Sequence, residues 1–261
     1  MSAELSSWIP KRRIHVALAV AFVFAVAAVV GSVWSLAFLA LLAPALGAGW
    51  VAFVMLRTRH QLSPRGGGWE GRIHDLVRAR LSLTIDSRAA VLDIGCGDGD
   101  LLIRLLRDAP GMTATGVDFW GKNWDYAQSS CEQRLRSHGL RASFECMDAA
   151  RLDFTDDRFD IVVSVMCFHE VHAPAGAATN GPLLALGEAV RVLSPGGVFV
   201  FIDRFGDEAD YGHGADLDGA LGAADEICRE SLVELLHLPW PLRSKRALGP
   251  VQIVSGRIAS R

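Results

Sequence analysis

The sequence contains a run of 43 residues, positions 14–56, without a single Asp, Glu, Lys or Arg. As one α-helix this run would be about 65 Å long, roughly twice the ~30 Å thickness of a bilayer's hydrocarbon core. The dipeptide Gly31-Ser32 offers a natural break. The run therefore predicts a two-helix transmembrane hairpin, with helices at about 14–30 and 33–56.

Two basic clusters flank this run and predict its orientation. They are Lys11, Arg12 and Arg13 before it, and Arg57, Arg59 and His60 after it. Because cytoplasmic flanks of membrane helices carry an excess of Lys and Arg, we expect both outer ends to face the cytoplasm. The predicted localisation is the cell membrane, multi-pass, with residues 1–13 and the remainder of the chain on the cytoplasmic side.

Two other interpretations of the run stay open. Its basic start and first apolar stretch loosely fit a signal peptide or a single span, although the second stretch would then act as a further span. A hairpin buried in a soluble core is the other, although 43 residues without a charge exceed what most cores contain.

The chain after the run has the composition of a soluble domain. Residues 57–68 (RTRHQLSPRGGG) predict a flexible linker, because Pro64 and three glycines interrupt regular structure. From residue 57 on there are 23 basic and 28 acidic residues, so we expect no nucleic-acid partner. The five cysteines are widely spaced without a CxxC motif, which indicates reduced thiols and no metal site.

Strand and helix patterns alternate through residues 69–261, the predicted globular domain. Buried strands are predicted at 89–94, 113–118, 141–146, 159–165, 198–203 and 251–258. Helices are predicted at 69–83, 100–107, 123–138, 183–193 and 217–236. This alternation favours an α/β fold with a mainly parallel sheet covered on both faces, and ligands of such sheets bind at the carboxyl ends of the strands.

A glycine-rich turn follows the first strand. Gly95, Gly97 and Gly99 are spaced GxGxG, not GxGxxG as in dinucleotide-binding folds. The carboxylates of Asp93, Asp98 and Asp100 would repel a pyrophosphate and suit a cationic ligand. Asp118, at the end of the second strand, could accept hydrogen bonds from a ribose diol. A tight turn that binds no ligand is the alternative.

At this point the sequence resembles the class I S-adenosylmethionine-dependent methyltransferases over most of residues 70–261. The matching stretches, in order and spacing, are VLDIGCGDG (91–99), TGVDF (115–119), CMDAARLDF (146–154), FDIVVSVMCFHEV (159–171) and EAVRVLSPGGVFVFID (188–203). The resemblance implies a Rossmann-like, mainly parallel seven-stranded sheet with helices on both faces, here preceded by two transmembrane helices. It also implies S-adenosyl-L-methionine as the cofactor.

The resemblance assigns roles to individual residues. The methionyl end of the cofactor would be lined by Asp93, Gly95, Gly97 and Gly99. Asp118 would hold the ribose hydroxyls, with Phe119 against the adenine. The adenine edge would be read by Asp148 and Ala149, and the donor methyl would lie near Ser164, Val165 and Met166.

Candidates for the chemistry follow the fourth and fifth strands. His169 and Glu170 come just after strand 159–165, and either could be a base or position the acceptor. Asp203, which ends strand 198–203, could contact the acceptor. The alternatives are a histidine hydrogen-bonded within its loop and a carboxylate that caps the next segment. The HEVH run is one residue short of HExxH, so zinc is not expected.

Two further segments have open interpretations. Trp120 and Trp124 could cover the cofactor or pack on the next helix. The Asp- and Gly-rich loop 206–219 could be a lid over the acceptor or a solvated loop.

The predicted function is a membrane-anchored S-adenosylmethionine-dependent methyltransferase that acts on a small-molecule or lipid-borne acceptor. The membrane contact would be made through residues 14–56. An NAD(P)-dependent oxidoreductase is one alternative, although GxGxG and Asp93 count against it. A non-enzymatic cofactor-binding membrane protein is another.

Overall fold

The computed structural model describes residues 8–81, 88–121, 127–222 and 224–260. These residues form two compact units, a helical hairpin and an α/β domain that begins at Arg72.

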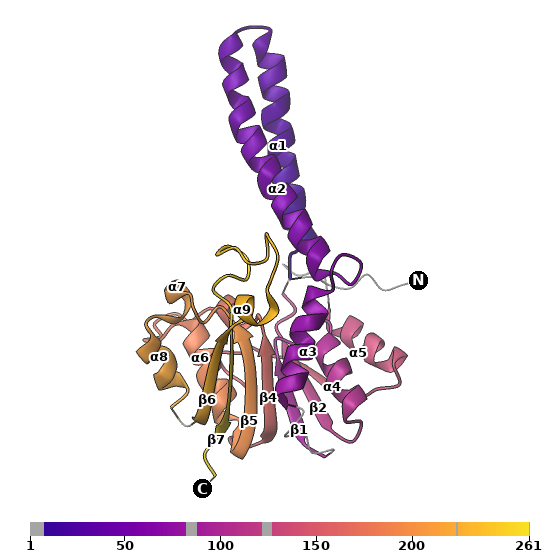
Figure 1. Ribbon diagram of the computed structural model, residues 1–261, viewed down its shortest axis with the longest axis vertical. Coiled ribbons are helices and arrows are strands. Elements are labelled where there is room, and N and C mark those ends of the chain that lie inside the picture. The colour runs from indigo at the N-terminus through magenta and orange to yellow at the C-terminus, as the bar shows by residue number, and fades with distance from the viewer. Residues whose placement is uncertain (1–7, 82–87, 122–126, 223, 261) are drawn as a thin grey trace. The chain divides into compact units, whose positions relative to one another are not determined.

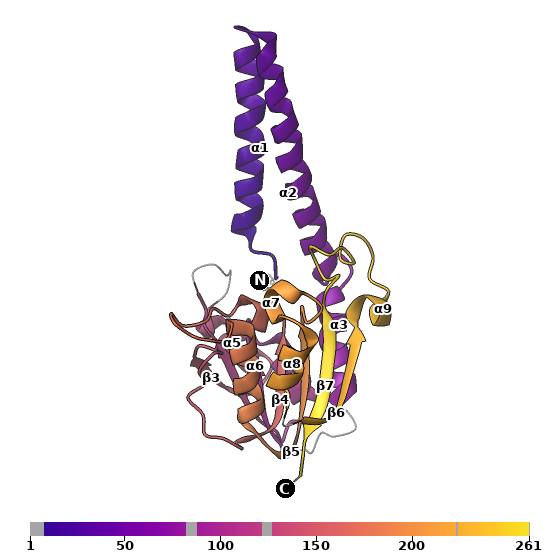
Figure 2. The ribbon, with the colours of Figure 1, turned by 90° about the vertical axis from the view of Figure 1, so that its left-hand side faces the viewer.

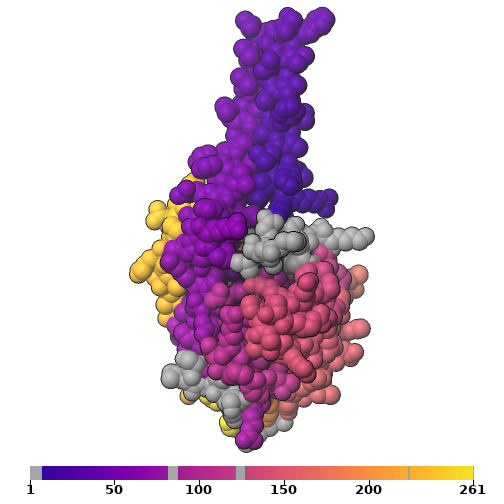
Figure 3. All heavy atoms as spheres, turned by 90° about the vertical axis from the view of Figure 1, so that its right-hand side faces the viewer, coloured from indigo at the N-terminus to yellow at the C-terminus, as the bar shows by residue number. Residues whose placement is uncertain are grey.

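The hairpin consists of two long helical segments. They are α1 (Lys11–Ser32), the 3-10 helix η1 (Leu36–Leu41) and α2 (Leu42–Leu62), which continues from η1. The two segments run side by side (Figure 1), and their surfaces are in contact in the space-filling view (Figure 3). At the turn, a Cβ atom on Gly31 would lie 2.3 Å from the Phe38 ring, so only glycine lets the two segments close there.

The surface of the hairpin is apolar almost throughout. Large apolar side chains such as Phe22, Trp34 and Leu46 are exposed on it. Each segment, Lys11–Ser32 and Leu36–Leu62, is long and apolar enough to cross a membrane by length and composition. Arg59 donates a hydrogen bond to the carbonyl of Ile9, which joins the two outer ends.

The predicted flexible linker 57–68 is wrong over its first half. Helix α2 continues to Leu62 because RTRHQL contains no glycine or proline, and Arg59 and His60 in its last turn complement the helix dipole. The amides of Gly66, Gly67 and Gly68 then donate to the Ser63 carbonyl. Ser63–Gly68 is therefore a hydrogen-bonded turn rather than a free linker.

The α/β domain is built on one seven-stranded sheet of order β3-β2-β1-β4-β5-β7-β6. The strands are β1 (Ala90–Ile94), β2 (Thr113–Asp118), β3 (Ser143–Cys146), β4 (Phe159–Val165), β5 (Leu193–Asp203), β6 (Ala224–Ser231) and β7 (Gln252–Ile258). Strand β7 is antiparallel to both of its neighbours, and the pairings among β1–β5 are parallel. The predicted Rossmann-like, mainly parallel seven-stranded sheet is confirmed.

Helices cover both faces of this sheet (Figures 1 and 2). The helices of the domain are α3 (Trp69–Leu81), α4 (Asp100–Asp108), α5 (Gln128–Ser137), α6 (Gly181–Arg191), α7 (Glu208–Tyr211), α8 (Gly214–Ala220) and α9 (Leu232–Leu236), with the 3-10 turn η2 (Phe168–Glu170). The figures place α3 on one face and α6 with α8 on the other. A continuous core of buried side chains, including Leu92, Val162, Leu186 and Phe201, lies under α6 and α8.

Most predicted elements are present, with two notable differences. The predicted helix 217–236 is wrong, because its middle is the edge strand β6, which pairs with β7. The predicted helix 183–193 ends at Arg191, and the Ser194–Gly197 turn lies inside β5, which starts at Leu193. Of the predicted helix 123–138, positions 123–126 lie outside the described residues.

Candidate functional site

The glycine-rich turn between β1 and α4 has the backbone that the GxGxG spacing requires. Gly95, Gly97 and Gly99 have φ angles of +76°, +56° and +80°, values that side-chain-bearing residues rarely adopt. A Cβ atom on Gly95 would lie 2.3 Å from the Cβ atom of Cys167. The turn therefore lies directly against the loop that follows β4.

Asp93 places a buried carboxyl group beneath this turn. Its side chain is almost fully buried, and its Oδ2 atom has no hydrogen-bond partner among the described residues. Burial, together with the charges of Asp118 and Asp98, raises the pKa of Asp93 to about 8. A buried acid without a partner is costly unless a cationic ligand completes it.

Asp118, the last residue of β2, is joined to the same turn. Its two carboxylate oxygens accept hydrogen bonds from the amides of Gly97 (3.0 Å) and Trp120 (2.8 Å). Burial raises the pKa of Asp118, although these amides act in the opposite direction. The carboxylate keeps further acceptor positions for a ligand.

Trp120 and Phe119 differ in their environments. The indole nitrogen of Trp120 donates to the Gly97 carbonyl at 3.1 Å, and its ring makes an edge contact with Phe144. Trp120 thus packs against the glycine turn. Phe119 is 69% exposed, which leaves its ring open to an incoming ligand. Trp124 lies outside the described residues.

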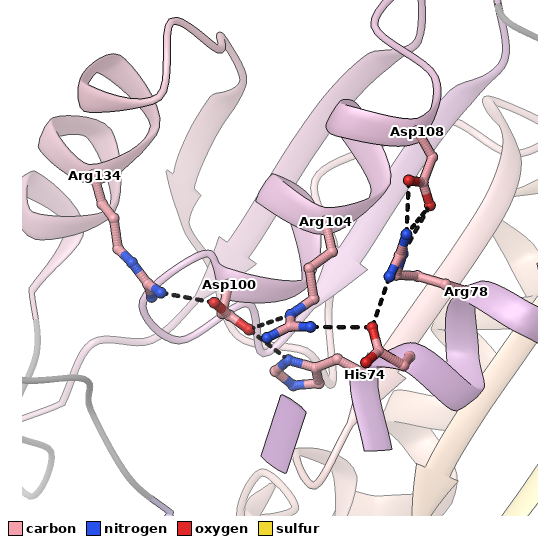
Figure 4. Close-up of polar contacts among 7 residues, drawn as sticks. His74, Arg78, Asp100, Arg104, Asp108 and Arg134 are labelled. Carbon is pink, nitrogen blue, oxygen red and sulfur yellow. Dashed lines mark hydrogen bonds and ion pairs between the residues drawn. The ribbon is translucent and has the colours of Figure 1, made fainter. Parts of the chain in front are cut away.

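A network of ion pairs holds the start of α4 (Figure 4). Arg134 of α5 pairs with Asp98 at 2.6 Å and with Asp100 at 2.7 Å. The other carboxylate oxygen of Asp100, Oδ2, accepts hydrogen bonds from His74 of α3 (2.9 Å) and from Arg104 (2.7 Å). These partners outweigh the effect of burial and hold the pKa of Asp100 well below its usual range.

The network decides which acidic groups remain open at the turn. Arg134 compensates Asp98 and Asp100, so the acidic groups left to face a ligand are Asp93 and Asp118. Sequence reasoning identified none of the compensating partners, because His74 and Arg134 lie in helices whose polar residues have no recognisable motif.

The remaining predicted cofactor residues lie at the same edge of the sheet or just below it. Asp148 follows β3, and its carboxylate accepts from the amide of Ala150 in a tight turn. Ala149 is buried in the main core. Ser164 is buried in β4 and donates to the Ile94 carbonyl at 2.8 Å. The Ser164 hydroxyl therefore joins β4 to β1 beneath the turn.

His169 and Asp203 meet at the ends of β4 and β5. Nδ1 of His169 lies 2.7 Å from Oδ1 of Asp203. Phe168, buried against Phe201, fixes the η2 turn that carries His169. Burial alone would lower the pKa of His169, but the hydrogen bond and charge of Asp203 outweigh it and raise this pKa.

Glu170 and the segment 206–219 complete this end of the sheet. Glu170 is half exposed, and its carboxylate lies 3.7 Å from Nε2 of His169. The segment 206–219 forms α7 and α8, and Tyr211 and Leu217 anchor it in the core. The solvated-loop interpretation is therefore wrong, and the lid over the acceptor stays a prediction.

Tyr211 is the residue of this group that sequence reasoning did not single out for chemistry. Its ring is buried, and burial together with the nearby carboxylate of Asp203 raises the pKa of its hydroxyl. The Asp203 carboxylate is thus close enough to influence both His169 and Tyr211.

The residues at the glycine turn fit S-adenosyl-L-methionine on two observations. The buried Oδ2 of Asp93 has no hydrogen-bond partner among the described residues, which leaves it open to a cationic donor, and three left-handed glycines bring the backbone within reach of a ligand. The Asp118 carboxylate suits a ribose diol.

Comparison with known proteins finds similarity to methyltransferases. Residues 91–197 match the family model described as "Methyltransferase domain". The chain is 34% identical over 113 residues to the demethylmenaquinone methyltransferase of Thermus thermophilus, covering 43% of this chain and 46% of that protein. It is 29% identical over 133 residues to the ubiquinone/menaquinone biosynthesis C-methyltransferase of Bdellovibrio bacteriovorus, covering 50% and 52%. The chain thus spans about half the length of the curated relatives it matches.

The solved structures confirm the fold. One S-adenosylmethionine-dependent methyltransferase, from Methanosarcina mazei, superposes with a TM-score of 0.51 at 17% identity, covering 70% of this chain and 98% of that one.

Proposed function

We propose that this chain is a membrane-anchored S-adenosylmethionine-dependent methyltransferase of class I, because residues 91–197 match the family model described as "Methyltransferase domain". Its acceptor in this proposal is a small membrane-borne molecule with an ionisable hydroxyl group, such as a quinol. The observation that carries the proposal is the hydrogen-bonded pair His169–Asp203. His169 follows Cys167 by two residues, and the Cys167 side chain lies against Gly95 of the glycine turn.

The acidic groups at the glycine turn would bind the cofactor. When bound, S-adenosylmethionine supplies an electrophilic methyl group on a sulfonium. Asp93 would pair with the ammonium of the methionyl end, alongside Gly95, Gly97 and Gly99, and Asp118 would accept from the ribose hydroxyls. The exposed Phe119 ring would lie against the adenine, whose edge Asp148 and Ala149 would contact, and Ser164 would support the floor near the methyl.

His169 would act as the general base. Its Nδ1 atom is engaged by Asp203, so the neutral ring carries its proton there and presents Nε2 as an acceptor. The acceptor's hydroxyl proton would move to Nε2 as the new bond to the methyl carbon forms and the carbon–sulfur bond breaks. This geometry is the orienting pair of general-base catalysis, and Asp203 would stabilise the resulting imidazolium.

The membrane-borne acceptor is supported by the hairpin and by the relatives. Two helices are long and apolar enough to cross a membrane, and both outer ends carry basic residues, which favours a cytoplasmic domain. Two relatives are named as methyltransferases of menaquinone or ubiquinone biosynthesis. A deprotonated quinol can accept a methyl group at oxygen or at ring carbon, and a base serves either outcome.

The proposal is tested first by cofactor binding. The full chain, reconstituted in lipid nanodiscs, is titrated with S-adenosylhomocysteine and separately with NADH. We expect micromolar or tighter affinity for S-adenosylhomocysteine and none for NADH. The reverse result would support an oxidoreductase instead. Binding without transfer of a labelled methyl group to any component of a membrane extract would support a non-enzymatic role.

A further inference from the structure

The segment 237–250, between α9 and β7, carries a basic and aromatic surface that the proposed chemistry does not use. Its sequence, HLPWPLRSKRALGP, has no acidic residue, although acidic residues outnumber basic ones in the chain from residue 57 on. Arg243, Lys245 and Arg246 are exposed, and Trp240 is 40% exposed. We refer to residues 237–250 as the basic loop.

The basic loop is an ordered structure rather than a loose excursion. Leu238, Leu242 and Leu248 are buried and anchor it. The amide of Leu248 donates to the Leu242 carbonyl at 2.9 Å, and the amides of Ala247 and Gly249 donate to the carbonyl of Ser244 at 2.9 and 2.8 Å. The three basic side chains are therefore presented together on a fixed backbone.

The sheet topology places the basic loop at the cofactor edge. Strands β5 and β6 are both antiparallel to β7, so they run in the same direction. The carboxyl ends of β1, β4, β5 and β6 therefore lie at one edge, and the chain leaves β6 there to form α9 and the basic loop. Figures 1 and 2 show this loop, in yellow, at the end of the sheet where α7 also lies.

The chain length between the hairpin and the domain limits the distance of this edge from the end of α2. Helix α3 precedes β1 and carries the chain from the carboxyl edge to the amino edge, so it begins at the former. Six residues, 63–68, separate Leu62 from Trp69, which corresponds to a span of about 25 Å at most. A hairpin inserted in a bilayer would thus tether the start of α3 within about 25 Å of the end of α2.

We propose that the basic loop binds the surface of an anionic lipid bilayer, with Arg243, Lys245 and Arg246 at the headgroups and Trp240 at the interface. This inference rests on the membrane insertion of the hairpin proposed above. Basic side chains are attracted to the anionic cytoplasmic leaflet, and tryptophan favours the headgroup level. The contact would hold the ends of β4 and β5, with His169 and Asp203, towards the lipid from which the acceptor comes.

The contact is tested by hydrogen–deuterium exchange of the full chain in nanodiscs. One set of nanodiscs contains phosphatidylcholine alone, and the other contains added phosphatidylglycerol. We expect amides of residues 239–249 to exchange about tenfold more slowly in the anionic nanodiscs, and this difference to disappear at high salt because surface charges are screened. Equal exchange in both lipids at low salt would overturn the proposal.

Matched variants locate the effect. Arg243→Glu, Lys245→Glu and Arg246→Glu together should abolish the lipid-dependent difference. The control variant carries Arg107→Glu, Arg136→Glu and Arg141→Glu, at residues exposed at the amino edge of the sheet. This variant should keep the lipid-dependent difference in exchange. Protection by an RNA oligonucleotide without any effect of lipid would also overturn the proposal and indicate a nucleic-acid surface.

The outcomes separate this inference from the proposed function. A chain that is not retained in nanodiscs contradicts the membrane anchor itself. A chain that is retained and transfers methyl groups, but shows no lipid-dependent protection of residues 239–249, contradicts only the basic-loop contact.

Discussion

Nδ1 of His169 lies 2.7 Å from Oδ1 of Asp203, and the Asp203 side chain is only 1% exposed. The carboxylate is a fixed, water-excluded partner behind the imidazole. It sets the tautomer of the neutral ring and directs Nε2 away from the core. The pair joins the ends of β4 and β5, so the position of His169, the proposed general base, depends on the register of these two central strands.

Replacing the imidazole should slow methyl transfer without weakening cofactor binding. For His169→Gln we expect transfer to fall about 10²- to 10⁴-fold, the usual contribution of a positioned general base. The Kd for S-adenosylhomocysteine should stay within about threefold, because His169 is not among the residues proposed to hold the cofactor. Calorimetric titration and single-turnover rates measure the two quantities. Parallel losses in both would mean that His169 has a structural role.

Replacing the carboxylate should move the pH profile. The base must be neutral, so the transfer rate should rise with pH through the raised pKa of His169. In Asp203→Asn the ring loses its charged partner, so the rising limb should shift to lower pH while the maximal rate falls. Glu208→Gln, at an exposed position in α7, is the control and should leave the limb in place. An unmoved limb in Asp203→Asn would show that another group titrates.

Asp93→Asn should stabilise the free protein while weakening cofactor binding. The folded-state pKa of Asp93 is about 8, above its ordinary value of 3.8. Because folding raises this pKa, the stability that the protonated Asp93 carboxyl contributes to the fold is fully present below pH 3.8. This contribution is lost as the pH rises through 8. Asparagine resembles the protonated acid and cannot ionise. The gain in Tm over the original chain should therefore grow between pH 4 and 8 and then level off.

The same variant tests the role of Asp93 in binding. A cationic ligand should favour the ionised carboxylate, so binding of S-adenosylhomocysteine near pH 7 should release protons. Calorimetry in buffers of different ionisation enthalpy detects this release. In Asp93→Asn this proton release should vanish, and the affinity for S-adenosylhomocysteine should fall at least about tenfold. Unchanged affinity would remove Asp93 from the proposed site.

Asp100→Asn should have the opposite pH dependence. The pKa of Asp100 is depressed by His74 and Arg104, so its contribution to stability is present above its ordinary pKa and lost as pH falls below it. The variant should be less stable than the original chain at pH 7, and this difference should be somewhat smaller at pH 3. Asp108→Asn, which breaks the more exposed pair with Arg78, should cost at most about 1 kcal/mol. Urea unfolding at both pH values measures these differences.

Gly95→Ala should destabilise the domain and impair cofactor binding. A side chain at φ +76° costs about 1–2 kcal/mol, and its overlap with Cys167 adds about 1–3 kcal/mol. Adding Cys167→Gly should recover the overlap cost but not the backbone cost. A double-mutant cycle without coupling between the two positions would contradict the close packing of the two loops.

The sequence predicted those elements whose pattern reflects burial on both faces of the sheet. Strands 113–118 and 159–165 were located correctly because their apolar runs end at Asp118 and Val165. Strand β6 was missed because it is an edge strand, mostly exposed, with a register shift between Asp225 and Cys228. Its polar residues resemble a solvated helix, and only pairing with β7 makes it a strand.

The candidate site was predicted as residue types at strand ends, but not as contacts. Asp93 and the glycines could be identified because their spacing is local. The pairing of His169 with Asp203 depends on the parallel registration of β4 and β5, 34 positions apart. The partners of Asp100, His74 and Arg134, lie on separate helices, so no sequence spacing links them.

The most direct test of the central claim is methyl transfer by the full chain in nanodiscs that contain a polyprenylated quinol lacking one ring methyl or methoxy group. With S-adenosylmethionine labelled on its methyl group, mass spectrometry should detect a quinol product that carries one labelled methyl. The product should depend on the chain and be strongly reduced with His169→Gln. If S-adenosylhomocysteine binds but no labelled quinol or other membrane component forms, the account of this protein as a membrane-acceptor methyltransferase is contradicted.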